Sequence, residues 1–425
     1  MGTLVKGSPS TSEESNPSPA PAEEPASAEA PAPVTSAPSP PAKQESDVKT
    51  TEPETPAAVP EPQEPPPTPI RLSSVAGYDG RVNDIVYCPP SVRSDHNKAV
   101  IYFGGDVQDL PETMEAHREN KNYAKWNLVN TSLILHTYFP EMHIIVVRPA
   151  RSTTPKLASF MELVSSDMEH SRMEFKTFSC YDNFVPGNNC GAPEHTPTHY
   201  ALQHLERLLQ ATSQRVRTLT VQQLGVGRSP SPTPHSATPP EKTEQENGEN
   251  PEPGPSKPTR WWQEDINLDK ADLTLVGFSK GCVVLNQLLY EFHYLKTLTP
   301  DDDTMMKLVS RIHDMYWLDG GHAGGKNTWI TSRSLLETLT RLNIGVHVHV
   351  TPYQVQDERR PWIRKEEKMF TELLRRLGAP VTRILHFENQ PASLMTHFEV
   401  LSVFRQTQNQ NNTGNSVSTP ASSTT

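Results

Sequence analysis

Short apolar runs alternate with amphipathic segments along the middle of the chain. Apolar residues recur at helical spacing in residues 127–136, 199–209, 282–295, 333–342 and 362–377. Between these segments lie runs with the composition of buried strands, at residues 99–103, 143–147, 273–276, 315–318, 345–350 and 381–387. Continuous apolar strands separated by helices are typical of a mostly parallel sheet that is covered on both faces. The pattern therefore predicts a doubly wound α/β domain, preceded by an antiparallel hairpin over residues 71–88.

Three segments lack the large apolar residues that such a core needs. Residues 1–69 are mostly Pro, Ala, Ser and Glu, and two further polar segments cover residues 225–259 and 407–425. Sequences of this composition do not bury enough apolar surface to offset the loss of chain entropy on folding. We therefore expect a disordered N-terminal tail, one domain over residues 70–406 with a disordered insertion, and a disordered C-terminal tail.

The bulk composition narrows the choice of partners and of compartment. Much of the formal net charge of −11 comes from the N-terminal segment, and no basic stripe with interleaved aromatic residues points to nucleic acid. No apolar run approaches the roughly 18–20 residues that a membrane span needs. The four cysteines show no C-x-x-C spacing, which favours free thiols in a reducing compartment. Since the N-terminal sequence also lacks a recognisable transit peptide, the residues alone favour a cytoplasmic location.

The strand at residues 273–276 runs directly into Gly277-Phe278-Ser279-Lys280-Gly281, and a helical segment begins at the next residue. This is the arrangement of a nucleophile elbow, in which a serine is held on a strained turn between a strand and a helix. The residues two before and two after the serine must be small, and both are glycine here. In this context the motif predicts an α/β-hydrolase-like fold with Ser279 as its nucleophile.

An acyl-transfer site also needs N–H groups that stabilise the oxyanion of the tetrahedral intermediate. The N–H of Lys280 would be one donor, because it begins the helix that follows the serine. The second donor is expected from the loop after the strand at residues 99–103, where Gly105 or Asp106 would supply it. The alternative for this loop is a plain tight turn, since glycine pairs mark turns in any fold.

A serine nucleophile needs a general base and a carboxylate that orients it, and in α/β hydrolases the acid and then the histidine follow the serine. His397 comes after the last predicted strand, in a short loop before a helical segment, which is the expected place for the base. We prefer Asp357 as the acid because it follows the fifth predicted strand. Asp319, which ends the fourth strand, is the alternative acid. Asp357 also stands beside Arg359 and Arg360, so a solvated ion pair is its other interpretation.

The chain offers no set of residues that predicts a metal or a cofactor. His347 and His349 lie two apart on a predicted strand and so share a face, but two histidines without a third ligand do not form a metal site. The glycine-rich residues 319–325 match no phosphate-binding signature. We therefore expect neither a metal nor a bound cofactor.

Long motifs at residues 103–108, 178–184, 191–195, 274–289, 315–322 and 349–355 closely resemble those of one animal family. These are the mitochondrial α/β-hydrolase-like proteins named in humans after an open reading frame on chromosome 2. The resemblance implies a mitochondrial location, a link to respiratory-chain function and a serine-hydrolase-like fold. It also implies that Ser279 is the serine of the family's Gly-Phe-Ser-Lys-Gly motif, and that His397 matches a His-Phe pair near the family's C-terminus.

Two functions are compatible with these residues. In the first, the protein is a serine hydrolase that acts on a small acyl substrate, an ester, thioester or amide, through Ser279, Asp357 and His397. In the second, it is a non-catalytic scaffold or interaction protein of mitochondrial metabolism, with a protein partner. Labelling by a fluorophosphonate probe distinguishes them, because only an activated serine reacts with it. The sequence does not specify the substrate.

Overall fold

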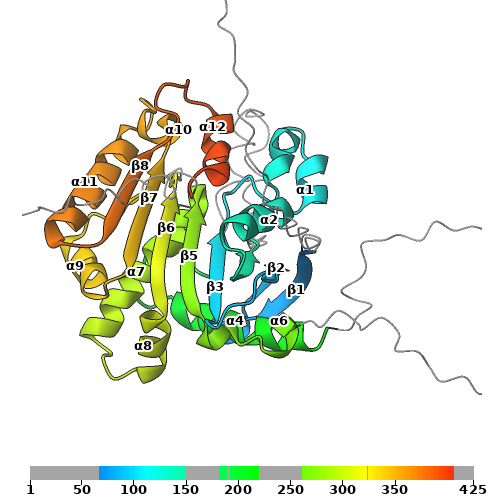
Figure 1. Ribbon diagram of the computed structural model, residues 1–425. Helices are drawn as coiled ribbons and strands as arrows, with labels where there is room; N and C mark the ends of the chain where they lie inside the picture. The colour runs from blue at the N-terminus through cyan, green and yellow to red at the C-terminus, as the bar shows by residue number, and fades with distance from the viewer. Residues whose placement is uncertain (1–66, 150–180, 189–191, 220–260, 323, 406–425) are drawn as a thin grey trace, which may run out of the picture. The chain divides into compact units, whose positions relative to one another are not determined.

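One sheet of eight strands runs through the described part of the chain, in the order β1-β2-β4-β3-β5-β6-β7-β8 (Figure 1). β2 is antiparallel to β1 and to β4, and the remaining pairs are parallel. This order with one antiparallel strand is that of the α/β-hydrolase fold, so the predicted fold class is confirmed. The strands are β1 (Ile70–Ala76), β2 (Val82–Cys88), β3 (Lys98–Phe103), β4 (His143–Val147), β5 (Asp272–Phe278), β6 (Ile312–Leu318), β7 (Gly345–Val350) and β8 (Val381–Leu385).

The computed structural model describes residues 67–149, 181–188, 192–219, 261–322 and 324–405, all within one compact unit. The segments predicted to be disordered lie outside the described residues, except for residues 67–69. The domain boundaries at residues 70 and 406 and the disordered insertion therefore stay predictions. Among the described helices, none combines the length and the hydropathy that crossing a membrane requires.

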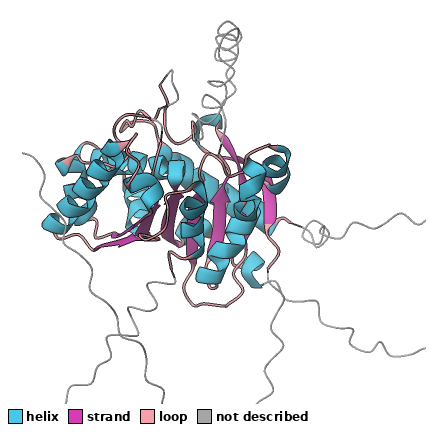
Figure 2. Ribbon diagram, turned by 90° about the horizontal axis from the view of Figure 1, so that it is seen from above, coloured by secondary structure: helices cyan, strands magenta, loops and turns pink. Residues whose placement is uncertain are grey.

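Helices cover both faces of the sheet (Figure 2). One face carries α4 (Ala201–Arg217), α7 (Cys282–Thr297), α8 (Asp303–Ser310), α9 (Arg333–Arg341) and α11 (Pro361–Leu377), whose apolar side chains share one core cluster with the strands. The other face carries α2 (Leu128–Tyr138), α12 (Leu394–Glu399) and the 3₁₀ turn η6 (Val400–Ser402), which form a second cluster. The short elements are α1 (Pro111–Ala116), α6 (Trp261–Glu264), α10 (Pro352–Val355), η1 (Tyr78–Gly80), η2 (Asn120–Trp126), η4 (Leu268–Lys270) and η5 (Ser279–Gly281).

Alternation along β5 separates the two core clusters. Leu273 and Leu275 point into the first cluster, and Val276 and Phe278 point into the second. Successive side chains of a strand point to opposite faces, so a strand that is apolar at nearly every position fits a sheet covered on both sides. The continuous apolar runs of the sequence thus have their cause in the layered core.

α11 begins and ends at residues suited to helix ends. Pro361 occupies the first turn, where an N–H has no partner within the helix, and Gly378 follows the helix with a φ of +82°. The inward face of the helix is apolar and fully buried at Ile363, Phe370 and Leu374. These three side chains pack α11 into the first core cluster.

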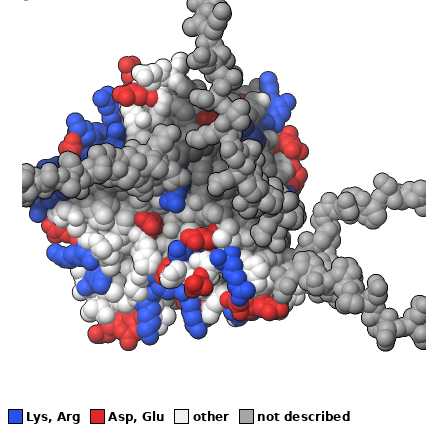
Figure 3. Space-filling view, in the orientation of Figure 1, with Lys and Arg blue, Asp and Glu red and all other residues white. Residues whose placement is uncertain are grey.

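Charged side chains of both signs share the surface, and Figure 3 shows them interspersed on the face seen there. Several form ion pairs at helical spacing, such as Arg333–Glu337 at 2.7 Å and Lys368–Glu372 at 3.8 Å. Exposed pairs of this kind contribute roughly 0–1 kcal/mol each. The stability of the fold therefore comes mainly from the two buried clusters.

Two elements near the C-terminus differ from the prediction. β8 ends at Leu385 rather than at residue 387, and α12 begins at Leu394, so His397 lies within a helix and not in a loop before one. A capping box starts this helix: the N–H of Thr396 donates to Ser393 Oγ at 3.1 Å, and the N–H of Ser393 donates to Thr396 Oγ1 at 3.2 Å. The cap therefore holds His397 on a regular helical turn.

Candidate active site

Ser279 lies on the turn between β5 and α7. Its φ is +52°, in the left-handed region that residues with a Cβ rarely adopt. Two glycines allow the chain to make this turn. A Cβ on Gly277 would lie 2.9 Å from Cα of Cys282, and a Cβ on Gly281 would lie 2.0 Å from the carbonyl oxygen of Phe103. The turn thus has the strained serine and the small flanking residues expected of it.

Gly281→Ala is expected to lower the free energy of unfolding by at least about 3 kcal/mol, because its Cβ would meet backbone atoms that cannot move aside. Gly325→Ala is a matched control, since a Cβ there meets nothing within 4 Å. Urea unfolding of both variants beside the wild type measures the difference. Equal stability of the two variants would contradict the close approach of this turn to the end of β3.

His397 projects from α12 beside the serine turn. Its side chain is buried, and its ring stacks on Phe278 with a centroid distance of 4.6 Å and packs on Tyr353 at 4.8 Å. Nδ1 of His397 lies 2.7 Å from Oδ2 of Asp319. A carboxylate can only accept, so Nδ1–H donates this bond and Nε2 is the unprotonated nitrogen of the neutral ring. Nε2 is therefore the nitrogen left for Ser279, which lines the same cavity.

Asp319 is fixed at the carboxyl end of β6 through both of its carboxylate oxygens. It is fully buried and has a φ of +46°. Oδ1 accepts the backbone N–H of Thr351 at 2.7 Å, and Oδ2 accepts the hydroxyl of the same residue at 2.5 Å. The N–H of Asp319 donates to the carbonyl of His349 at 2.6 Å. A buried carboxylate with this many bonds has a set direction, and that direction is toward His397.

Asp357, the acid preferred from the sequence, lies elsewhere. It follows α10 and accepts hydrogen bonds from Nε of Arg359 at 3.1 Å and from Nε of Arg360 at 2.8 Å. Burial raises the pKa of Asp357, but the bonds from Arg360 and Arg359 outweigh burial and bring the pKa down to about 2. The predicted contact between Asp357 and His397 is therefore wrong, because the two arginines bind this carboxylate. Asp319, the alternative acid, occupies the place beside the histidine.

The loop after β3 approaches the serine closely. A Cβ on Gly105 would lie 3.1 Å from Cβ of Ser279, so any side chain at this position would crowd the serine. The N–H of Gly105 donates to Oε1 of Gln108 at 3.1 Å, and the same oxygen accepts the hydroxyl of Tyr102 at 2.7 Å. The N–H of Gly105 is therefore engaged within the loop, and Asp106, the other predicted donor, lines the cavity.

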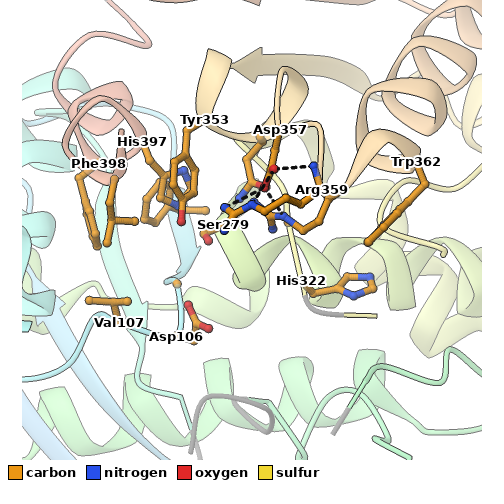
Figure 4. A pocket seen from close by; sticks show the side chains of 16 residues that line it. Asp106, Val107, Ser279, His322, Tyr353, Asp357, Arg359, Trp362, His397 and Phe398 are labelled. Carbon is orange, nitrogen blue, oxygen red and sulfur yellow. Dashed lines mark hydrogen bonds and ion pairs between the residues drawn. The ribbon is translucent and has the colours of Figure 1, made fainter. Parts of the chain in front are cut away.

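These groups line one cavity of about 600 Å³ at the carboxyl ends of the strands (Figure 4). Ser279 and His397 face it, together with Asp106 from the loop after β3. Figure 4 shows Tyr353 beside His397, and Asp357 joined to Arg359 on the same side of the cavity. Open α/β sheets place their ligands at this edge, and the volume suits a small organic molecule.

Two other reactive side chains lie near the serine. Burial is the main effect that lowers the pKa of His322 to about 4, and both of its ring nitrogens bond to backbone groups of its own loop. Cys282 is buried, and burial raises the pKa of its thiol above the usual range. A neutral histidine with both nitrogens engaged is a poor general base, and an un-ionised thiol is a poor nucleophile. Ser279 and His397 are the better-suited pair.

Comparison with known proteins establishes the family of the chain. A family profile described as C2orf69 matches residues 71–170 and 168–380, which is more than half of the sequence. The chain belongs to the C2orf69 family. It is 40% identical over 346 residues to the mitochondrial protein C2orf69 homolog of Mus musculus, covering 79% of this chain and 86% of the mouse protein. It is 38% identical over 310 residues to the mitochondrial protein C2orf69 of Homo sapiens, covering 72% and 74%.

Membership of the C2orf69 family also bears on the compartment. The relatives from mouse, human and Danio rerio, the last 35% identical over 348 residues, are all named mitochondrial proteins. The mitochondrial location expected from the resemblance is therefore supported. The cytoplasmic location favoured by the residues alone is corrected.

Solved structures similar to this C2orf69-family chain are remote in sequence. The esterase Est22 is 13% identical with a TM-score of 0.35, covering 81% of this chain and 79% of Est22. A dienelactone hydrolase from Anabaena variabilis is 8% identical with a TM-score of 0.32, covering 80% and 98%. The fold assignment for the C2orf69-family chain therefore depends on its own sheet order, and the site depends on its own geometry.

Several residues of the C2orf69-family site were not expected from the sequence. Thr351 and Gln108 hold the two loops that flank the serine, while Gln354 and Trp362 line the cavity. Gln108 carries a weak signal, because a glutamine three residues after a glycine pair can cap the loop. The others act through contacts between distant segments, which no local pattern indicates.

Proposed function

We propose that this C2orf69-family protein is a serine hydrolase, with Ser279 as nucleophile, His397 as general base and Asp319 as the acid that orients the base. The proposal is supported by one observation above all. A buried carboxylate–histidine hydrogen bond of 2.7 Å stands beside a serine with a φ of +52°, and serine and histidine face one cavity. The chain order of serine, acid and histidine is also that of α/β hydrolases.

The geometry suits acyl transfer from an ester, thioester or amide. Ser279 Oγ attacks the carbonyl carbon while its proton passes to Nε2 of His397. Asp319 keeps Nδ1 protonated and stabilises the positive charge that develops on the ring. When the tetrahedral intermediate collapses, His397 returns the proton to the leaving alcohol, thiol or amine. A water molecule, deprotonated by the same histidine, then hydrolyses the acyl-serine.

Backbone N–H groups are the proposed stabilisers of the oxyanion. The N–H of Lys280 follows the serine at the start of η5 and α7, where helical N–H groups point toward the cavity end of the turn. The N–H of Asp106 would approach from the loop after β3. Each such donor is worth roughly 3–4 kcal/mol to the transition state when it is preorganised.

The mitochondrial location of the family supports a mitochondrial setting for the proposed reaction, and the resemblance suggests a link with respiratory function. A reaction on a small acyl substrate requires no protein partner. A non-catalytic scaffold remains the alternative function, and its signature would be a serine that does not react.

Fluorophosphonate labelling tests the proposal. The wild-type protein should form a covalent adduct, and mass spectrometry of the digest should locate it on Ser279, because an activated serine attacks the phosphorus as it attacks a carbonyl. Acid-denatured protein is the control for non-specific reaction. Absence of labelling, or an adduct on any other residue, would favour the scaffold.

A further inference from the structure

One wall of the active-site cavity carries polar groups that have no partner among the described residues. This wall, residues 353–362, comprises α10, the loop after it and the start of α11. Gln354 is buried, and its Oε1 makes no hydrogen bond. The indole Nε1 of Trp362 is also buried without a partner, and Figure 4 shows this side chain directed toward the part of the cavity where His322 lies. Buried polar groups are nearly always hydrogen-bonded, so the indole N–H of Trp362, which needs an acceptor, points to an oxygen of a bound ligand, while Oε1 of Gln354 is itself an acceptor and needs a donor.

Arg360 adds further donors to the 353–362 wall. Its side chain is 23% exposed and lines the cavity, and its Nε donates to Asp357 at 2.8 Å. Its two terminal nitrogens make no hydrogen bond within the described part of the chain. The guanidinium lies 5.9 Å from the ring centre of Tyr353, which packs on His397, so a single ring separates Arg360 from the proposed base. A guanidinium with free N–H groups matches the geometry of a carboxylate or a phosphate.

The charges on this side of the cavity do not cancel. Among the described residues of this wall that line the cavity, Asp357 is the carboxylate and Arg359 and Arg360 are the cations, which leaves one positive charge. Glu358 also belongs to the wall, but it is exposed and does not line the cavity. Asp357 stays ionised, since its pKa is about 2, and it holds Arg360 in place through Nε. The residue expected from the sequence to orient the base thus anchors Arg360.

The opposite side of the cavity has a different character. The apolar side chains of Val107 and Phe398 lie there, away from Arg359, as Figure 4 shows, and Leu394 also lines the cavity. Asp106 lies on the Val107 side, as Figure 4 shows. An elongated substrate with one charged end and one hydrocarbon part therefore fits the cavity in a single direction, with its charge toward residues 353–362.

We propose that the 353–362 wall binds an anionic oxygen group, a carboxylate or a phosphate, on the acyl chain of the substrate. Arg360 supplies the charge and the paired donors, and the N–H of Trp362 donates a further hydrogen bond. The substrate class is then an ester or thioester of an acid that carries a second acidic group. This assignment rests on the proposed hydrolase activity and specifies its substrate.

Paired esters of matched chain length test the assignment on the full-length protein. p-Nitrophenyl hydrogen glutarate carries the anion, and p-nitrophenyl pentanoate lacks it. Wild type should have the higher kcat/KM for the glutarate ester. Arg360→Gln should lower that value roughly 10- to 100-fold, the worth of hydrogen bonds to a charged group. The same variant should change hydrolysis of the pentanoate ester less than about threefold.

Two further variants separate recognition from general charge effects. Arg364→Gln removes an exposed cation from α11 that does not line the cavity, and it should leave both esters unaffected. Arg360→Lys keeps the charge but loses the planar pair of donors, so it should restore part of the preference for the glutarate ester. An equal loss on both esters in Arg360→Gln would show that Arg360 acts only through Tyr353 and His397, and would overturn the assignment.

Calorimetric binding to Ser279→Ala distinguishes failure of this assignment from failure of the proposed activity. Glutarate should bind this variant, and the double variant with Arg360→Gln should lose that binding. If neither ester is hydrolysed but the Arg360-dependent binding is present, the activity fails and the anion subsite stands. If Ser279-dependent hydrolysis occurs without any effect of Arg360, the subsite fails and the activity stands. Phosphonobutanoate in parallel shows which acidic group depends more strongly on Arg360.

Discussion

Ser279→Ala is expected to lower kcat for an activated ester by roughly four to six orders of magnitude while leaving KM within about threefold. The alanine removes the only atom that forms the acyl-enzyme bond, and His397 and Asp319 then have no nucleophile to activate. The residual rate should still exceed that in water, because backbone N–H groups and the cavity continue to bind the substrate. Stopped-flow release of p-nitrophenolate measures the burst, which should disappear together with kcat.

A matched variant makes this result specific. Ser334 is exposed on α9 and does not line the cavity, so Ser334→Ala should keep wild-type kinetics. Thermal unfolding should give similar midpoints for the two variants, because neither serine side chain supports the core. If Ser279→Ala retained the burst, another residue would be the nucleophile, and the serine mechanism would have to be abandoned.

The layered fold could be predicted because its signals are local. Each buried strand is a short apolar run, and β4 and β7 begin and end at the predicted residues. The positive φ of Ser279 was also foreseeable, since the glycines on either side are there for close approach to Cys282 and Phe103. Such features depend on a few consecutive residues, so the local sequence is enough to predict them.

The choice of acid could not be made from the sequence, because Asp319 and Asp357 both follow strands that end at the same edge of the sheet. Their surroundings decide the matter. Thr351 and His397 meet Asp319 from other segments, whereas Arg359 and Arg360 bind Asp357 from its own loop. The arginines two and three residues after Asp357 did indicate this outcome. A carboxylate that pairs with arginines of its own loop is not available to orient a histidine.

The placement of His397 shows a second limit. The helix that carries it begins at Leu394 through a capping box formed by Ser393 and Thr396. The common signature has Glu or Gln at the position of the threonine, so the start of the helix gave no clear signal. The unpartnered groups of the 353–362 wall could not be predicted from the sequence at all. Whether a polar group lacks a hydrogen bond depends on the folded cavity and not on any single residue.

Asp319→Asn is expected to lower kcat by about three to four orders of magnitude, with little change in KM. An amide in place of Oδ2 can donate to Nδ1 of His397, which then stabilises the tautomer that presents a proton rather than a lone pair to Ser279. The bonds from Thr351 favour the isosteric side chain in the same position, so folding should persist. Activity against p-nitrophenyl pentanoate, followed across the neutral pH range, measures the loss.

Two other aspartates make the comparison decisive. Asp314 forms a similar pair with His347, at 2.8 Å, but lies outside the active-site cavity, so Asp314→Asn controls for the loss of an aspartate–histidine bond. Asp357→Asn should lower kcat for the neutral ester by less than about tenfold, because Asp357 contacts arginines and not the base. If Asp357→Asn lowered kcat as much as Asp319→Asn, Asp357 would have to contact His397 during turnover. The acid preferred from the sequence would then be the correct one. A much larger loss of kcat in Asp319→Asn than in Asp357→Asn would assign the orienting role to Asp319, at the end of β6. Thr351 fixes the position of this carboxylate before any substrate binds.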